Sequence, residues 1–168
     1  FQNVIKTVIE NSNWGEIKKG LYKGFSAYYC HNTHVAQVAE VVMKNNSPVV
    51  QRVVCVVDCG KLVNPLGGNN QVVGGVIDGV GHAMYGEFEF RKGSPRAKNF
   101  NRYKLIRMDQ SPKVDVHFID SNHSPTGLGE PSLPPVGAAV ANAIYKATGY
   151  RLMNQPFVEE LKLKKVLG

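Results

Sequence analysis

Two apolar runs joined by a polar turn decide the fold of this 168-residue chain. They read Val35-Ala-Gln-Val-Ala-Glu-Val-Val-Met43, then Lys44-Asn-Asn-Ser-Pro48, then Val49-Val-Gln-Arg-Val-Val-Cys-Val-Val57. Both runs are rich in β-branched residues, and Asn, Ser and Pro are turn formers. This combination predicts a β-hairpin.

Strand-like composition also occurs on both sides of the hairpin. Residues 25–30 precede it, and residues 87–90, about 100–108 and 114–119 follow it. In the last of these segments, Val and Phe alternate with Asp and His, which is the pattern of a half-buried strand. We therefore expect further strands beside the hairpin.

Two helices are predicted in the first half of the chain. Apolar residues recur at helical spacing over residues 4–9, and a loop expected at residues 64–70 leads to a second helix over residues 71–85. Four glycines lie in the second helix, at positions 74, 75, 79 and 81, and each costs up to ~1 kcal/mol relative to Ala. Close approach of another backbone or of a ligand explains them, and so does tight packing on a sheet.

The clearest helix is predicted over residues 133–148. From Val136 its apolar residues fall at i, i+3, i+4, i+7, i+8 and i+11, with Ser132 available as the N-cap and Gly149 as the end. The basic segment at residues 162–167 is expected to be an exposed tail. Together the elements predict an α+β fold with mixed or antiparallel sheets and two buried helices.

Composition indicates a folded chain without a membrane span. Hydrophobic residues make up 43% of it, and no apolar run reaches the ~18 residues that a spanning helix needs. The cysteines, Cys30, Cys55 and Cys59, are too few for a disulfide framework, so we expect buried thiols, with redox chemistry as the alternative. The chain begins at Phe1 rather than Met, and we expect residues 1–168 to be one domain or a fragment of a longer protein.

The net charge of +7 is concentrated in one stretch. Residues 91–113 carry eight basic side chains against Asp109 alone, whereas basic and acidic groups balance in the rest of the chain. A solvated strand and loop surface explains this stretch, and so does a surface that docks an acidic partner. No RNA-binding, zinc-finger or helix-turn-helix pattern is present, so we expect no nucleic-acid partner.

Common cofactor and metal motifs are missing from the sequence. Neither Gly-x-Gly sequence has the third glycine and preceding strand of a dinucleotide-binding loop, and there is no Gly-Lys-Ser/Thr phosphate loop. His31 and His34 are three residues apart without the Cys or carboxylate companions of a zinc site. We therefore expect no metal ion that protein side chains bind directly.

One stretch is suited to catalysis: Ser124-Pro-Thr-Gly127-Leu-Gly129-Glu130-Pro131. Pro131 biases Glu130 toward an extended backbone, and the two glycines leave room beside the carboxylate. Such a carboxylate can act as a rigid general base that faces a cavity. It can equally complement the positive end of the helix that follows, and the residues alone leave both interpretations open.

Several motifs follow one another along nearly the whole chain at consistent spacing. They are Val35-Ala-Gln-Val-Ala-Glu-Val41, Val57-Asp-Cys-Gly60 with Val63-Asn-Pro65, Gln71 with Gly74-Gly75, Tyr85-Gly-Glu87, Asn99-Phe100, Leu105-Ile-Arg-Met108, Gly129-Glu-Pro-Ser-Leu-Pro-Pro135, Ala138-Ala-Val-Ala-Asn-Ala-Ile144 and Ala147-Thr-Gly149. In this order they resemble molybdenum hydroxylases of the xanthine dehydrogenase and aldehyde oxidase family, in particular the isoquinoline 1-oxidoreductase beta subunit branch. The family's earlier cofactor-binding loops have no counterpart here. The resemblance therefore implies the C-terminal portion of a molybdopterin-binding large subunit.

The resemblance also implies roles for two residues. Glu130 matches the glutamate that acts as general base at the Mo–OH group, and Gln71 matches a glutamine whose amide hydrogen-bonds the pterin cofactor. An ordinary polar helix start is the alternative for Gln71. At Val73 the chain departs from the family, which usually has Glu there.

The implied parent enzyme hydroxylates an N-heteroaromatic or aldehyde carbon with water-derived oxygen. It would contain molybdenum–molybdopterin in the cytosine dinucleotide form, and its partners would be the rest of the large subunit and a small iron–sulfur subunit with [2Fe-2S] clusters. The present chain alone is expected to be inactive. The alternative is a non-catalytic binding or assembly module that docks a partner through residues 91–113.

Overall fold

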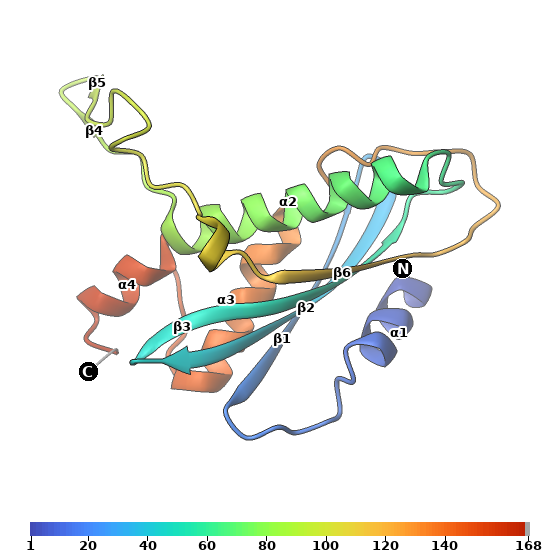
Figure 1. Ribbon diagram of the computed structural model, residues 1–168, viewed down its shortest axis with the longest axis horizontal. Helices are drawn as coiled ribbons and strands as arrows, with labels where there is room; N and C mark the ends of the chain where they lie inside the picture. Colours follow the sequence, from blue (N-terminus) through green and yellow to red (C-terminus); the bar gives the residue numbers. More distant parts are fainter. Residues whose placement is uncertain (167–168) are drawn as a thin grey trace.

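The computed structural model describes residues 1–166, in which helices cover both faces of one sheet (Figure 1). The sheet has four strands in the spatial order β1-β2-β3-β6. Their bounds are β1 Leu21–Cys30, β2 Thr33–Lys44, β3 Ser47–Asp58 and β6 Lys113–Phe118. The first three strands are antiparallel neighbours, and β6 runs parallel to β3. This mixed sheet with its helices confirms the predicted α+β fold.

The predicted hairpin is formed by β2 and β3. Lys44 pairs with Ser47, so the turn consists of Asn45 and Asn46, whose φ angles are 47° and 60°. Two left-handed residues are typical of a tight hairpin turn, and Asn tolerates this backbone better than most residues. The central strands are apolar on both faces because both faces are covered.

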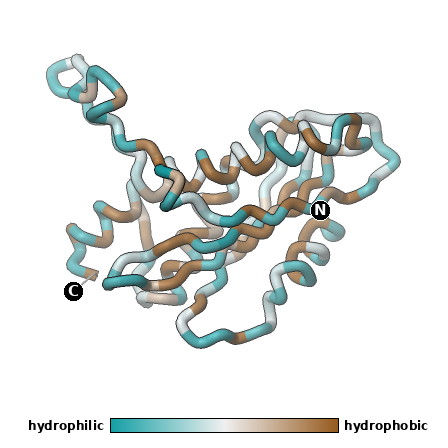
Figure 2. The backbone as a smooth tube through the Cα atoms, viewed as in Figure 1, coloured by the Kyte–Doolittle hydropathy of each residue, from teal (hydrophilic) through white to brown (hydrophobic). Residues whose placement is uncertain are grey.

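Four helices surround the sheet: α1 Gln2–Asn11, α2 Pro65–Tyr85, α3 Pro134–Thr148 and α4 Phe157–Leu163. Val4 and Val8 of α1 pack on one face of the sheet, against Val54 and Val56. The larger core lies on the other face, where α2, α3 and α4 pack. Figure 2 shows hydrophobic residues gathered in the sheet and these helices.

Glycines bring α2 close to the start of α3. A Cβ atom at Gly79 would lie 2.8 Å from the carbonyl oxygen of Leu133, and one at Gly75 would overlap Ser132 Oγ. At Gly74, by contrast, a Cβ would meet no atom within 4 Å. Of the explanations that the sequence left open, close approach of another backbone therefore applies to Gly79.

The start of α2 corrects the sequence prediction. The expected loop at residues 64–70 is wrong, because the helix begins at Pro65 rather than at residue 71. Asn64 is the N-cap, and its side chain accepts a hydrogen bond of 2.9 Å from the Gly67 N–H. A capping Asn followed by Pro at the first helical position outweighs the weak helix propensity of the next residues.

Two further predictions are wrong. Ser132 does not cap α3, because this helix begins at Pro134 with Leu133 as its N-cap, and no side chain bonds the helix end. Ser132 is instead buried between α2 and β2 neighbours, and Gln37 donates to its carbonyl oxygen at 2.7 Å. The strand expected at about residues 100–108 does not form; the chain there is irregular and leads to a short 3-10 helix, η1 Met108–Gln110.

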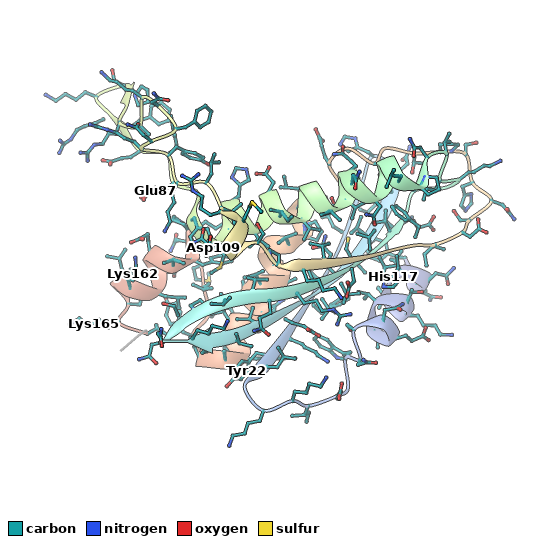
Figure 3. The ribbon with its side chains drawn as sticks, viewed as in Figure 1. Tyr22, Glu87, Asp109, His117, Lys162 and Lys165 are labelled. Atoms are coloured by element: carbon teal, nitrogen blue, oxygen red, sulfur yellow. The ribbon has the colours of Figure 1, made fainter. Side chains whose placement is uncertain are left out.

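Residues 87–103 form an arm that stands away from the body of the protein (Figures 1 and 3). It contains a two-stranded ribbon of β4 Phe90–Arg91 and β5 Ser94–Pro95, so the strand expected at residues 87–90 is present only at its end. Aromatic rings join within the arm, with the Phe88 ring centroid 5.2 Å from that of Phe90. Most of the basic stretch therefore lies on a projecting, solvated element.

The chain ends beyond α4. The segment expected to be an exposed tail is exposed from Lys162 to Lys165, but Lys162 and Leu163 belong to α4 and Val166 is half-buried against the larger core. Leu167 lies outside the described residues. Across residues 1–166, no helix is both long and apolar enough to cross a membrane.

Candidate functional site

Gln71 and Glu130, the two residues singled out by the resemblance, lie beside each other in the fold. Gln71 is exposed on the second turn of α2, and Glu130 is in the loop between β6 and α3. The Gln71 Nε2 atom donates a hydrogen bond of 2.7 Å to the carbonyl oxygen of Gly129. The side chain of Gln71 thus anchors the residue directly before Glu130.

The loop before Glu130 is fixed at two more points. The Thr126 N–H donates to the carbonyl oxygen of Cys59 at 2.9 Å, which ties the loop to the end of β3. The Gly127 N–H donates to the carbonyl oxygen of His31 at 3.1 Å, and Thr33 Oγ1 donates to the Gly127 carbonyl at 2.5 Å. Because Thr33 is buried, these bonds hold the loop firmly against the β1–β2 turn.

The Glu130 carboxylate points outward and contacts one side chain. It is 77% exposed, and its Oε2 atom lies 2.8 Å from His31 Nε2. The side chain bonds no backbone N–H of α3, although the Glu130 carbonyl accepts from the Leu133 N–H at 3.0 Å. The carboxylate is therefore not used to cap α3 and is free to face a ligand.

Open space lies next to Glu130 on the side of Gly129. A Cβ at Gly129 would meet no atom within 4 Å, whereas one at Gly127 would lie 2.6 Å from His31 Cβ. The room that was expected beside both glycines thus exists only at Gly129, and Gly127 serves the contact with the turn. A pocket of about 250 Å³ adjoins the site between the start of α2 and the loop. Its lining includes Lys61, Asn64, Gly67, Gln71, Thr126 and Leu128.

The groups at this site include an amide that could bind an organic ligand. Within residues 1–166 no three His, Cys, Asp or Glu side chains gather closely enough to hold a metal. The Gln71 Oε1 atom has no hydrogen-bond partner among the described residues and can accept from an N–H group of a ligand. An amide acceptor beside an open carboxylate suits a heterocyclic cofactor that carries its own metal.

The remaining candidate residues lie elsewhere or have structural surroundings. His34 packs against the rings of Tyr29 and Phe1, with centroid distances of 4.7 and 5.1 Å, and burial lowers its pKa. Burial raises the pKa of Cys55 to about 12, so this thiol is inert at neutral pH. Burial also raises the pKa of Cys59.

His31 is the site residue that the sequence did not reveal. In the sequence, His31 is a candidate only as a zinc ligand together with His34, and it lacks the companion residues of such a site. Its contact with Glu130 could not be predicted because the two residues lie far apart in the chain. The available signal was His31-Asn32 between two strand-like segments, because both residue types tolerate the left-handed backbone of a hairpin turn.

Solved structures identify the fold. The chain superposes on quinoline 2-oxidoreductase from Pseudomonas putida 86 with a TM-score of 0.71 and 18% identity, covering 80% of this chain and 18% of that one. It also superposes on the aldehyde oxidoreductase from Desulfovibrio desulfuricans with a TM-score of 0.63 and 26% identity, covering 71% and 14%. The fold is thus that of a segment of molybdenum hydroxylases.

Sequence comparison gives the family. A profile described as the molybdopterin cofactor-binding domain matches residues 6–112, which include Gln71, and the chain belongs to this family of molybdenum hydroxylases. It is 32% identical to the beta subunit of isoquinoline 1-oxidoreductase from Brevundimonas diminuta, over 98% of this chain and 22% of the relative. It is 31% identical to a membrane-bound aldehyde dehydrogenase (pyrroloquinoline-quinone) from Gluconacetobacter polyoxogenes, over 91% and 21%. The chain spans about a fifth of the length of these relatives.

Proposed function

We propose that this chain is the C-terminal portion of a molybdopterin-dependent large subunit and that Glu130 is its general base. The observation that carries the proposal is the exposed Glu130 carboxylate on a loop that Gln71, Thr33 and His31 hold in place. A proton acceptor must be accessible and well oriented, and the exposed carboxylate and the anchored loop support this role. The relatives are named for isoquinoline and for aldehyde, which supports an N-heteroaromatic compound or an aldehyde as substrate.

Each residue has a distinct part in this proposal. When bound, the molybdenum–molybdopterin cofactor would supply the two-electron oxidation, which protein side chains cannot carry out. Gln71 would accept a hydrogen bond from the pterin edge through Oε1, while its Nε2 donates to Gly129 and so holds the loop before Glu130 in place. The Glu130 carboxylate would take a proton from the water-derived nucleophile, and positioned proton transfer of this kind contributes ~10²–10⁴-fold to rate.

The remaining parts of the enzyme belong to the proposal as well. We assign the cytosine dinucleotide form to the cofactor and [2Fe-2S] clusters to a small partner subunit, on the strength of the family resemblance. Support for partner subunits comes from the relatives, several of which are named as subunits. Because the chain is a fifth of their length, it should be inactive alone; turnover by the 168-residue chain with added cofactor would contradict this.

Glu130→Gln in the full-length subunit tests the assigned base. Turnover of isoquinoline, nicotinate or acetaldehyde with a dye acceptor should fall at least ~100-fold, because an amide cannot accept the proton. The molybdenum content should stay near that of the parent. Glu10→Gln, at an exposed carboxylate on α1, is the matched control and should leave the rate unchanged. An unchanged rate for Glu130→Gln would remove the role.

A second proposal concerns the arm. We propose that it packs against the remainder of the large subunit, because it is basic and exposes Phe90 and Phe100, which are 64% and 73% accessible. The relatives extend far beyond this chain and supply the length for such a contact. Phe90→Ser with Phe100→Ser should lower the stability of the full-length subunit more than that of the 168-residue chain. If the two substitutions lower stability equally in the 168-residue chain and in the full-length subunit, the arm does not pack against the rest of the subunit and is a solvated loop.

A further inference from the structure

The turn between β1 and β2 has a left-handed backbone at both of its residues. Cys30 pairs with Thr33, so only His31 and Asn32 connect the strands, and their φ angles are 51° and 59°. A two-residue turn of this kind matches the twist of the strands and is rigid. Asn and His are both among the residue types that adopt this left-handed backbone more often than most. The rigid turn therefore fixes the direction in which the His31 side chain extends from the backbone.

This turn and the first residue of β2 both hydrogen-bond the loop that carries Glu130. Its backbone accepts from the Gly127 N–H through the His31 carbonyl, and Thr33 Oγ1 reaches both the Gly127 carbonyl and Thr126 Oγ1, the latter at 2.7 Å. The contact is so close that a Cβ at Gly127 would collide with His31 Cβ. Thus the position of His31 relative to the loop is fixed by the backbone before its imidazole makes any contact.

The imidazole then makes the one side-chain bond to the Glu130 carboxylate among the described residues. His31 Nε2 lies 2.8 Å from Glu130 Oε2. An ionised carboxylate can only accept, so Nε2 carries the proton in this bond. Glu130 also acts on the neighbouring thiol of Cys30, whose pKa is raised chiefly by burial and in addition by this carboxylate.

We propose that His31 is a positioning residue that holds the Glu130 carboxylate in the orientation needed for proton transfer. The inference rests on the proposed function of Glu130. A glutamate at a surface samples several rotamers, and only some of them point an oxygen at the reacting group. A hydrogen bond from a rigid turn selects one rotamer in advance, and misplacement of a catalytic group by ~1 Å lowers rates by ~100-fold.

Substitutions of His31 in the full-length subunit test the inference. Asn keeps the tolerance for a left-handed backbone but is too short to reach Glu130, whereas Gln can place an N–H near the position of Nε2. We expect His31→Asn to lower kcat by ~10- to 100-fold with KM and molybdenum content nearly unchanged, and His31→Gln to restore most of the rate. His34→Asn, on the same hairpin but without contact to Glu130, is the matched control.

A crystal structure of each variant gives a readout that does not depend on turnover. The Glu130 side chain should occupy one conformer in the parent and in His31→Gln, and several in His31→Asn. The inference is overturned if His31→Asn leaves kcat and the Glu130 conformer unchanged, or if it loses rate only in proportion to molybdenum and Gln does not restore it. Full activity of Glu130→Gln would instead show that Glu130 is not the general base, and the conformers of Glu130 would then show only whether His31 orients this carboxylate.

Discussion

Two glycines of α2, five residues apart, should respond in opposite directions to the same substitution. At Gly79 an added Cβ meets the Leu133 carbonyl oxygen at 2.8 Å and Val136 Cβ at 3.1 Å, so α3 must move. At Gly74 the same atom enters open space. Ala is preferred to Gly in a helix, partly because Gly loses more conformational freedom on folding.

The magnitudes follow from these surroundings. Gly74→Ala should stabilise the chain by ~0.4–1 kcal/mol, since nothing opposes the gain in helix propensity. Gly79→Ala has the same gain, but overpacking in a close helix contact costs ~1–3 kcal/mol. We therefore expect Gly79→Ala to lower the free energy of unfolding by up to ~2 kcal/mol. Because the gain is the same in both variants, they should differ by the overpacking cost of ~1–3 kcal/mol.

Urea unfolding of the 168-residue chain measures both values. The midpoints should move in opposite directions with unchanged slopes, because neither substitution alters the surface exposed on unfolding. If Gly79→Ala is as stable as Gly74→Ala, the packing of α2 on α3 does not require a glycine, and the explanation given for Gly79 is wrong.

Three other outcomes are expected. Burial opposes ionisation of Asp115, but hydrogen bonds from Arg52 and Lys113 outweigh it and lower its pKa, so its ionised form stabilises the fold. Asp115→Asn should therefore reduce the free energy of unfolding at pH 7. The difference between the variant and the parent should shrink as the pH falls below the ordinary Asp pKa of 3.8, because the carboxylate is then protonated in the parent. Urea unfolding measured at several acidic pH values tests this. Glu160 accepts from two backbone N–H groups in the segment before α4, so Glu160→Gln should lower the free energy of unfolding by ~1–3 kcal/mol in urea titrations. Alkylation of the folded chain at pH 8, followed by mass spectrometry, should modify the half-buried Cys30 before Cys55. Equal rates of modification at the two cysteines would contradict the conclusion that the Cys55 thiol is inert.

Local patterns predicted most of the secondary structure for identifiable reasons. The β2–β3 hairpin followed from β-branched runs around a turn, and α3 followed from an apolar stripe that packs against the sheet. The first turns of α2 escaped prediction because Gly67 and Gly68 are poor helix formers. In the structure Gly68 is buried against Leu62 and Leu128, so packing supports the helix where propensity does not.

The arm shows the opposite error. Residues 100–108 have strand-like composition, yet no neighbouring strand of the described chain is available to pair with them. A strand needs a partner for its backbone groups, and composition alone cannot supply one. The segment instead returns irregularly to α2, where Ile106 packs over Gly81.

The sequence by itself determined the hairpin, the amphipathic helices and the family, because these depend on residue types at short or ordered spacings. It also singled out Gln71 and Glu130. Only the tertiary structure decided that Gln71 holds Gly129 and that His31 contacts Glu130. These bonds join residues far apart in the chain, and they form because the sheet and α2 bring the β1–β2 turn and the loop before α3 to the same edge of the protein.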